Sequence, residues 1–184
     1  KYAIGGLILD HVRLGDAPNT TPLGAAAYQA KYGRSLSLDW NNTNGPGGTY
    51  PPSLYEFNEQ TISGFVKLVA DRVRSIKPNI IITADVGDGG PGHPSGENYL
   101  FPYIQGQNSS DWVNRGVIDS LVTMYYVNGD IFAGAGQFIF SYHRRSLINP
   151  DQASWVAGTY QGISASALAS QVTSWMQTYG TAPQ

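Results

Sequence analysis

Two aspartates follow apolar runs, in positions where a carboxylate can do acid–base chemistry. Asp10 is the first charged residue after residues 2–9, which are small or apolar, and Asp85 follows a similar run at residues 79–84. Strands buried in parallel α/β folds end in this way, and the carboxyl ends of such strands carry the ligand sites. A lone Asp after a strand can equally be a turn or helix-capping residue. The presence of two such residues favours a site with two catalytic carboxylates at the carboxyl ends of the strands, which form one rim of the sheet.

Two further ionisable residues lie close to Asp10 in the sequence. The guanidinium of Arg13 is within reach of the same rim, where it would stabilise the ionised form of Asp10 and orient it. A salt bridge that only fixes the loop is an equal alternative. His11 is predicted to contact a substrate. The chain's three histidines have no metal-ligand spacing, so neither a metal site nor a cofactor is expected.

Aromatic and polar side chains gather in the segments that follow the expected strands. A cleft that pairs aromatic faces with Asp, Asn and Arg suits a sugar ring, whose C–H faces are apolar and whose edge carries hydroxyls. The same aromatics could instead belong to the core. Besides His11 and Arg13, the residues predicted to bind such a substrate are Asp88, Glu97, Trp112, Tyr125, Tyr126 and Tyr160. Of the acidic residues, Asp85, Asp88 and Glu97 are alternative proton donors.

The segment from Gly87 to Gly92 matches the glycine pattern of a dinucleotide-binding loop. That pattern needs a helix to begin at once, and Pro91 and Pro94 interrupt any such helix. A nucleophile elbow of the form G-x-S-x-G is absent from the sequence. A nucleotide-binding protein or a doubly wound hydrolase is therefore disfavoured, and the segment is interpreted as a loop over the rim.

Composition limits the kinds of partner. Only 13% of the 184 residues are charged and the net charge is −2, so no basic surface is expected for nucleic acid. No apolar run approaches the roughly 20 residues that cross a bilayer, and no membrane span is predicted. Cysteine is absent, which excludes disulfides and thiolate sites. Little lysine beside abundant Asn, Thr, Ser, Gly and Tyr favours a secreted, cell-surface or periplasmic protein.

The elements that must position these residues alternate between strand and helix. The clearest is a helix at about 57–77, whose apolar residues recur at spacings of three and four until Pro78 ends it. The other expected elements are strands at 1–10, 79–85, 117–126 and 153–160, and helices at 22–32, 110–115, 131–148 and 164–179. Buried strands that alternate with helices predict a single α/β domain, 1–184, with an all-parallel sheet, either doubly wound or a (β/α)₈ barrel.

Four stretches of the chain, in order, resemble the glycosyl-hydrolase-like 10 family of barrel proteins. They are residues 4–14 around Asp10 and Arg13, residues 57–78, residues 111–126 with Asp111 and Trp112 at their start, and residues 156–160. The resemblance implies a (β/α)₈ TIM barrel of which this chain is a fragment with strands four to seven, the remainder of the barrel lying in a longer parent chain. Asp85 stands where the family usually has a small residue, so its role depends on the strand-end argument alone.

The predicted function is glycoside hydrolysis of a poly- or oligosaccharide, with Asp10 ionised and a second carboxyl group as the acid. The alternative is a non-catalytic glycan-binding barrel domain with the same aromatic rim. Such a domain would lack a second carboxyl group at hydrolytic separation, which is roughly 5 to 9.5 Å.

Overall fold

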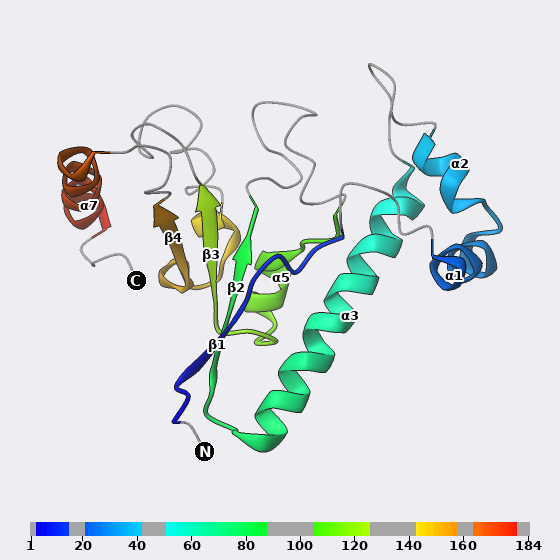
Figure 1. Cartoon of the computed structure of the whole chain (residues 1–184), viewed down its shortest axis with the longest axis horizontal. Coiled ribbons are helices and arrows are strands. Elements are labelled where there is room, and N and C mark those ends of the chain that lie inside the picture. The colour runs from blue at the N-terminus through cyan, green and yellow to red at the C-terminus, as the bar shows by residue number, and fades with distance from the viewer. Residues whose placement is uncertain are drawn as a thin grey trace.

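The computed structural model describes residues 3–14, 21–41, 51–87, 105–125, 143–157 and 164–179. They form a mixed α/β structure around a four-stranded sheet, shown in Figure 1. Every pair of neighbouring strands is parallel, and the strands follow one another across the sheet in chain order. The prediction of an α/β fold with an all-parallel sheet is therefore confirmed. The strands are β1 (Gly6–Leu9), β2 (Ile81–Val86), β3 (Ser120–Tyr125) and β4 (Ala153–Ala157).

The helices agree with the sequence pattern, with two additions. The long helix α3 begins earlier than predicted, because the two prolines at its start fit the position before a helix and its first turn. Helix α2 and the 3₁₀ turn η2 were not predicted, since each is too short to show a period. The predicted helix at 131–148 lies largely outside the described residues. The helical elements are α1 (Pro22–Tyr32), α2 (Leu36–Asn41), α3 (Pro52–Ile76), α5 (Ser109–Asn114), η2 (Pro150–Gln152) and α7 (Ala165–Tyr179).

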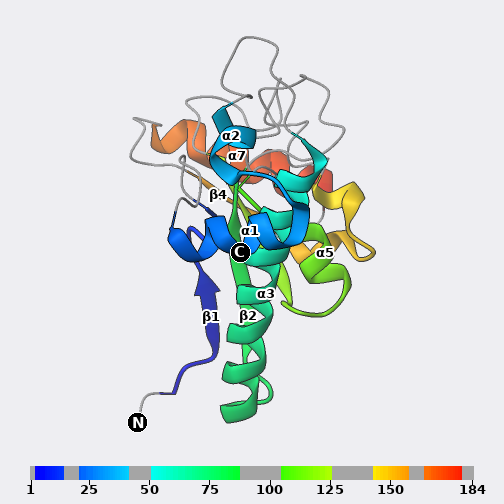
Figure 2. The same ribbon diagram turned by 90° about the vertical axis from the view of Figure 1, so that its right-hand side faces the viewer.

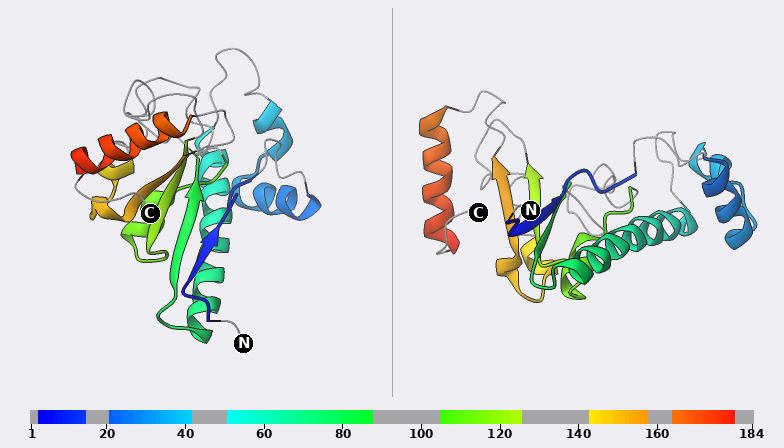
Figure 3. Two further views of the ribbon diagram at one scale, coloured as in Figure 1. Left: turned by 60° about the vertical axis from the view of Figure 1, so that its left-hand side comes forward. Right: turned by 60° about the horizontal axis from the view of Figure 1, so that its bottom comes forward.

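The strands and α3 run in opposite directions, so the carboxyl ends of the strands lie near the amino end of α3. Figure 2 shows α3 running beside β1 and β2. Helices α1 and α2 lie next to the amino end of α3, whereas α7 lies beyond β4, at the other end of the molecule (Figures 1 and 3). The carboxyl ends of the strands define what we call the rim.

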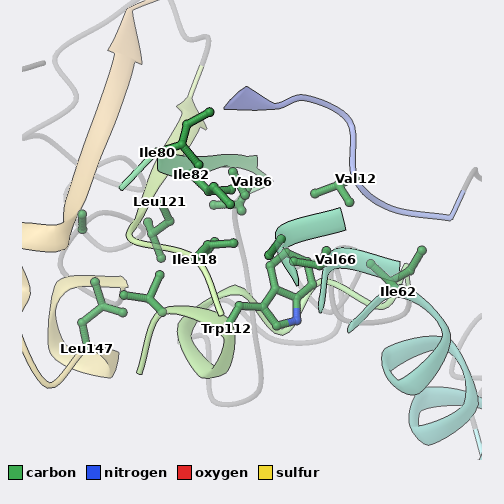
Figure 4. Close-up of a cluster of buried hydrophobic side chains, with 14 residues drawn as sticks. Val12, Ile62, Val66, Ile80, Ile82, Val86, Trp112, Ile118, Leu121 and Leu147 are labelled. Carbon is green, nitrogen blue, oxygen red and sulfur yellow. The ribbon is translucent and has the colours of Figure 1, made fainter. Parts of the chain in front are cut away.

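One hydrophobic core holds α3 and α5 against a single face of the sheet. Alternate residues of β2, namely Ile82, Ala84 and Val86, are buried in it. Trp112 of α5 belongs to the same cluster, has 1% of its surface exposed and lies beside Val66 (Figure 4). The indole Nε1 of Trp112 donates a hydrogen bond of 2.6 Å to Ser63 Oγ on α3, which satisfies the polar atom of this large ring. Since strand side chains alternate, the other residues of β2 point to the opposite face.

That opposite face is open in the part of the chain that the structure describes. Ile8 is 62% exposed and Ile81 is 58% exposed. The prediction that the strands are buried on both faces is therefore wrong for β1 and β2 as described, because the core packs against one face only. We call the exposed side the open face of the sheet.

The amino ends of β2 and β3 are fixed to α3 by one ion pair. Arg74 donates to Asp119 Oδ2 at 3.0 Å and to the carbonyl of Val117 at 2.7 Å. The same Asp119 oxygen accepts a 2.7 Å hydrogen bond from the amide of Ile82. A single carboxylate thus connects a helix and two strands at the end of the sheet opposite the rim.

A second, smaller core joins α1 and α2 to the start of α3. Its polar centre is Asp39, which accepts two hydrogen bonds from Arg34 and one of 2.7 Å from the hydroxyl of Tyr28. The hydrogen bonds from Arg34 are the main reason why the pKa of Asp39 is lowered. The charged carboxylate is thereby compensated although it is buried, as stability requires.

The turn at residues 105–108 packs closely against α3. Gly106 has a φ of +85°, and a Cβ atom at that position would lie 2.4 Å from the carbonyl oxygen of Asn58. Gly116 also has a positive φ, of +68°, but no heavy atom lies within 4 Å of its ideal Cβ position. Glycine is therefore required at 106 for two reasons and at 116 for one.

We predict that Gly106→Ala destabilises the protein more than Gly116→Ala does. Left-handed backbone costs an alanine roughly 1–2 kcal/mol at either position, and the steric conflict with α3 should add about 1–3 kcal/mol at position 106. Urea unfolding followed by circular dichroism measures both free energies. Equal losses in the two variants would contradict the close approach of the turn to α3.

Candidate functional site

The parallel register of β1 on β2 brings the two predicted carboxylates side by side. Leu9 is paired with Ala84, so the next residues along the two strands are Asp10 and Asp85. The two strands end at the same rim, as the sequence predicted. The negative charge of Asp10 accordingly raises the pKa of Asp85.

Asp85 lies inside β2 rather than after it, because the strand continues to Val86. Its side chain points to the open face and is half-buried, while its neighbours Ala84 and Val86 are buried in the core. Burial raises the pKa of Asp85, the negative charge of Asp10 raises it further, and His11 opposes both effects. Asp85 is therefore the carboxyl group of the pair that retains its proton more readily than an ordinary aspartate does.

Asp10 lies on the turn that follows β1 and is 63% exposed at its side chain. Its neighbour His11 has a φ of +50°, a left-handed conformation that histidine adopts more readily than most residues. The imidazole Nε2 of His11 is 3.8 Å from Asp10 Oδ1, and its Nδ1 is 3.5 Å from a guanidinium nitrogen of Arg13. The expectation for Arg13 thus needs correction: its contact is with His11, and His11 is the group next to Asp10.

The open face beside the carboxylates carries hydroxyl groups. Thr83 is paired with Ser120 across β2 and β3, and their side-chain oxygens are 2.7 Å apart. Ile8 is paired with Thr83 on the other side, and Val122 is paired with Asp85. The face therefore presents carboxylates at the rim, a hydroxyl pair one step below, and apolar groups around them.

Trp112 is not at the rim, so its prediction as a substrate-binding residue is corrected. Its side chain fills the core on the helix side of the sheet and has almost no exposed surface to offer a sugar. The cause is the apolar stripe of α3, which packs on the indole. Tyr125 is the last residue of β3, and its side chain lies outside the described part of the structure. The other predicted substrate-binding residues, Asp88, Glu97, Tyr126 and Tyr160, lie outside the described residues.

The sequence did not identify two features of the rim. The hydroxyl pair of Thr83 and Ser120 could have been found only from the register of β2 on β3. Gln107 is buried, with a hydrogen bond to the backbone just after β2 and another to the backbone just after β1. A glutamine in an irregular turn gives no sequence signal of such a position.

A groove with a volume of about 360 Å³ lies between α3 and α5. Acidic and basic groups both line it, Glu59 and Lys67 on α3 and Asp111 and Arg115 at α5. It is on the helix side of the sheet, so it does not connect with the open face that carries Asp85. Within the described ranges, no cluster of three or more His, Asp or Glu side chains could hold a metal ion, and no helix is long and apolar enough to cross a membrane.

Comparisons with models of protein families, with curated proteins and with solved structures find no match for this chain. The class of protein is therefore defined by fold and geometry: a parallel α/β protein with two interacting carboxyl groups at the carboxyl ends of neighbouring strands. In such folds this is the location where ligands bind.

We predict that Asp85→Asn is more stable than the wild type at neutral pH. Because the pKa of Asp85 is raised in the folded state, the folded protein binds a proton more tightly than the unfolded chain, and ionisation at high pH costs stability. That cost should disappear as the pH falls from the raised pKa to below the ordinary value, since Asp85 is then neutral in both states. Asparagine cannot ionise and avoids the cost.

Free energies of unfolding measured at several pH values test this prediction. Asp71→Asn on the exposed side of α3 is the control, because its ion pair with Lys67 is exposed and should change stability by less than about 1 kcal/mol. Equal stability of Asp85→Asn and the wild type at neutral pH would show that ionised Asp85 is not unfavourable.

Proposed function

We propose that this chain is part of a glycoside hydrolase that acts on a poly- or oligosaccharide. Asp85 is the general acid and Asp10 is the ionised carboxylate. The observation that carries the proposal is the placement of the two carboxyl groups at the carboxyl ends of adjacent strands, with the pKa of Asp85 raised by burial and by the charge of Asp10. Glycoside hydrolysis requires a carboxyl group with a raised pKa as the acid and a second carboxyl group close to it.

The roles follow from the two environments. Asp85 gives its proton to the glycosidic oxygen as the bond to the anomeric carbon breaks, so the sugar leaves as a neutral alcohol. Asp10, which is exposed to water, either attacks the anomeric carbon or removes a proton from the attacking water. The positive charge that develops on the sugar ring is stabilised by the negative charge of Asp10. If Asp10 attacks, ionised Asp85 then takes a proton from the water that releases the sugar from Asp10. If Asp10 acts as the base, Asp85 takes up a proton from solvent and Asp10 gives one to solvent.

The surface around the carboxylates is suited to a neutral sugar. The hydroxyl groups of Thr83 and Ser120 can exchange hydrogen bonds with sugar hydroxyls, and Ile8 provides an apolar contact for a ring face. The chain has a net charge of −2, which gives no long-range attraction for an acidic substrate. A secreted, cell-surface or periplasmic protein would meet such glycans.

We also propose that the sheet is part of a (β/α)₈ barrel related to the glycosyl-hydrolase-like 10 family. Two features support this proposal. The strands are added in one direction, whereas a doubly wound sheet reverses its strand order at the ligand site. Right-handed crossovers in one direction put all helices on one face, and the core lies on one face here.

The remaining βα units of that barrel would cover surfaces that are exposed in the described structure. Beside the open edge of β1, the flank of α3 carries the exposed apolar side chains of Phe65, Leu68 and Ile76. Ile81, the first residue of β2 and therefore far from the rim, is exposed on the open face. Exposed apolar groups that continue from a helix to a strand edge are typical of an interface. We propose that further strands and helices of a longer parent chain bind there.

We predict that Asp85→Asn and Asp10→Asn each reduce glycan turnover by roughly 10²–10⁴-fold, the usual contribution of a positioned acid or base. Release of reducing ends from a panel of neutral polysaccharides by the full-length protein is the measurement. Asp71→Asn on α3 should retain full turnover. Both active-site variants should remain folded by circular dichroism.

Unchanged turnover in folded Asp10→Asn protein would contradict the assignment of Asp10. If the wild-type protein binds a polysaccharide of the panel but releases no reducing ends, the non-catalytic glycan-binding barrel is the correct alternative.

We predict that, in the protein with the remaining βα units, Ile81→Asn costs roughly 2–5 kcal/mol, because a polar group replaces a covered apolar side chain. Ile148→Asn is the control, since Ile148 is 83% exposed and lies away from the open face. Its substitution should change stability by about 0.5 kcal/mol or less. Similar small losses of stability in both variants, measured by denaturant unfolding, would contradict the proposal that further βα units cover Ile81.

A further inference from the structure

The side chain of Gln107 forms hydrogen bonds to the backbone of two segments, one that follows Asp10 and one that follows Asp85. Its Oε1 accepts a 3.0 Å hydrogen bond from the amide of Gly87, and its Nε2 donates a 3.5 Å hydrogen bond to the carbonyl of Val12. Val12 is two residues after Asp10, and Gly87 is two residues after Asp85. One amide group therefore spans the same two chain segments that present the carboxylates.

The pairing of β1 with β2 is not enough to fix the position of Asp10. The pairing of β1 with β2 ends at Leu9 and Ala84, and β1 is only four residues long. The left-handed conformation of His11 then turns the chain away from the sheet direction. The position of Asp10 relative to Asp85 must therefore be fixed by contacts beyond the end of the strand.

The turn that carries Gln107 is itself held in place by three contacts, one to the segment after β1 and two to α3. The carbonyl of Gln105 accepts a 2.9 Å hydrogen bond from the amide of Leu14, beyond β1. Gly106 fits closely against the backbone of α3, and Asn108 Nδ2 donates to Glu59 Oε1 at 2.8 Å. Gln107 is thus attached to a supported turn. Only 5% of the residue is exposed, so its two hydrogen bonds are shielded from water.

We propose that Gln107 is a positioning residue that sets the separation of Asp10 and Asp85. The inference rests on the proposed function in one respect, namely that the two carboxyl groups act together. The geometry of the bridge is independent of the substrate. Catalysis by paired groups depends on their separation so strongly that a shift of about 1 Å can cost roughly 10²-fold in rate.

Loss of the bridge should change Asp85 in a direction that can be measured. The ionisable groups near Asp85 come from the turn after β1, namely Asp10 and His11, with Arg13 behind His11, while β3 contributes the neutral Val122. If the turn moves away, Asp85 loses the repulsion of Asp10 and gains water. Both changes lower the pKa of Asp85, and they outweigh the loss of the smaller, opposing effect of His11.

The test is Gln107→Met, which keeps the size of the side chain and removes both hydrogen bonds. We expect kcat on the glycan to fall roughly 10- to 100-fold with little change in KM, because the carboxylates are misplaced while the binding surface remains. We also expect the pKa of Asp85, followed by ¹³C NMR of its carboxyl group, to fall below that of the wild type. The matched control is Gln171→Met on α7, a glutamine that is also 5% exposed, which should change neither quantity.

A folded Gln107→Met protein with wild-type kcat and an unchanged Asp85 titration would overturn the proposal. If the methionine variant does not fold, Gln107→Asn replaces it, since the shorter amide reaches one of the two chain segments only. The titration needs no substrate, so it tests the bridge even if the wild-type protein turns over no glycan. That last result would contradict the proposed function and leave the positioning role to be decided by the titration.

Discussion

The register of β1 on β2 is the constraint on which the site depends. Pairing of Leu9 with Ala84 makes Asp10 and Asp85 neighbours, and a slip by one residue would turn one of them to the other face of the sheet. The register is maintained from the helix side, where Ile82, Ala84 and Val86 enter the core. Packing on one face of the sheet thus determines the chemistry of the other face.

This arrangement places in β2 a carboxyl group, that of Asp85, whose ionisation is unfavourable. Asp85 is half-buried, its pKa is raised, and the larger of the two charge effects on it comes from a group of the same sign. By contrast, the buried carboxylate of Asp39 has Arg34 and Tyr28 as partners, and its pKa is lowered. One protein therefore contains a carboxylate whose charged form is stabilised and another whose charged form is destabilised, a perturbation that is typical of acid–base sites. The contrast is the physical basis for assigning a function to Asp85.

Much of the fold could be predicted from the sequence, because long apolar periods encode it. The stripe of α3 and the apolar runs of β2 and β3 each identified an element and its type, and alternation of strands with helices predicted parallel pairing. Short elements such as α2 have too few residues for a period. The rim was only partly predictable: the strand-end position of Asp10 was apparent, but burial of Trp112 depends on which face of α5 meets α3. The role of Gln107 depends on three segments far apart in the sequence.

The most direct test of the paired carboxylates is a site-resolved ¹³C titration of Asp85 in the wild-type protein and in Asp10→Asn. The predicted result is a pKa of Asp85 above its ordinary value in the wild type that falls, but stays raised by burial, when the charge of residue 10 is removed. A pKa of Asp85 that is the same in both proteins would contradict the pairing of the two carboxyl groups.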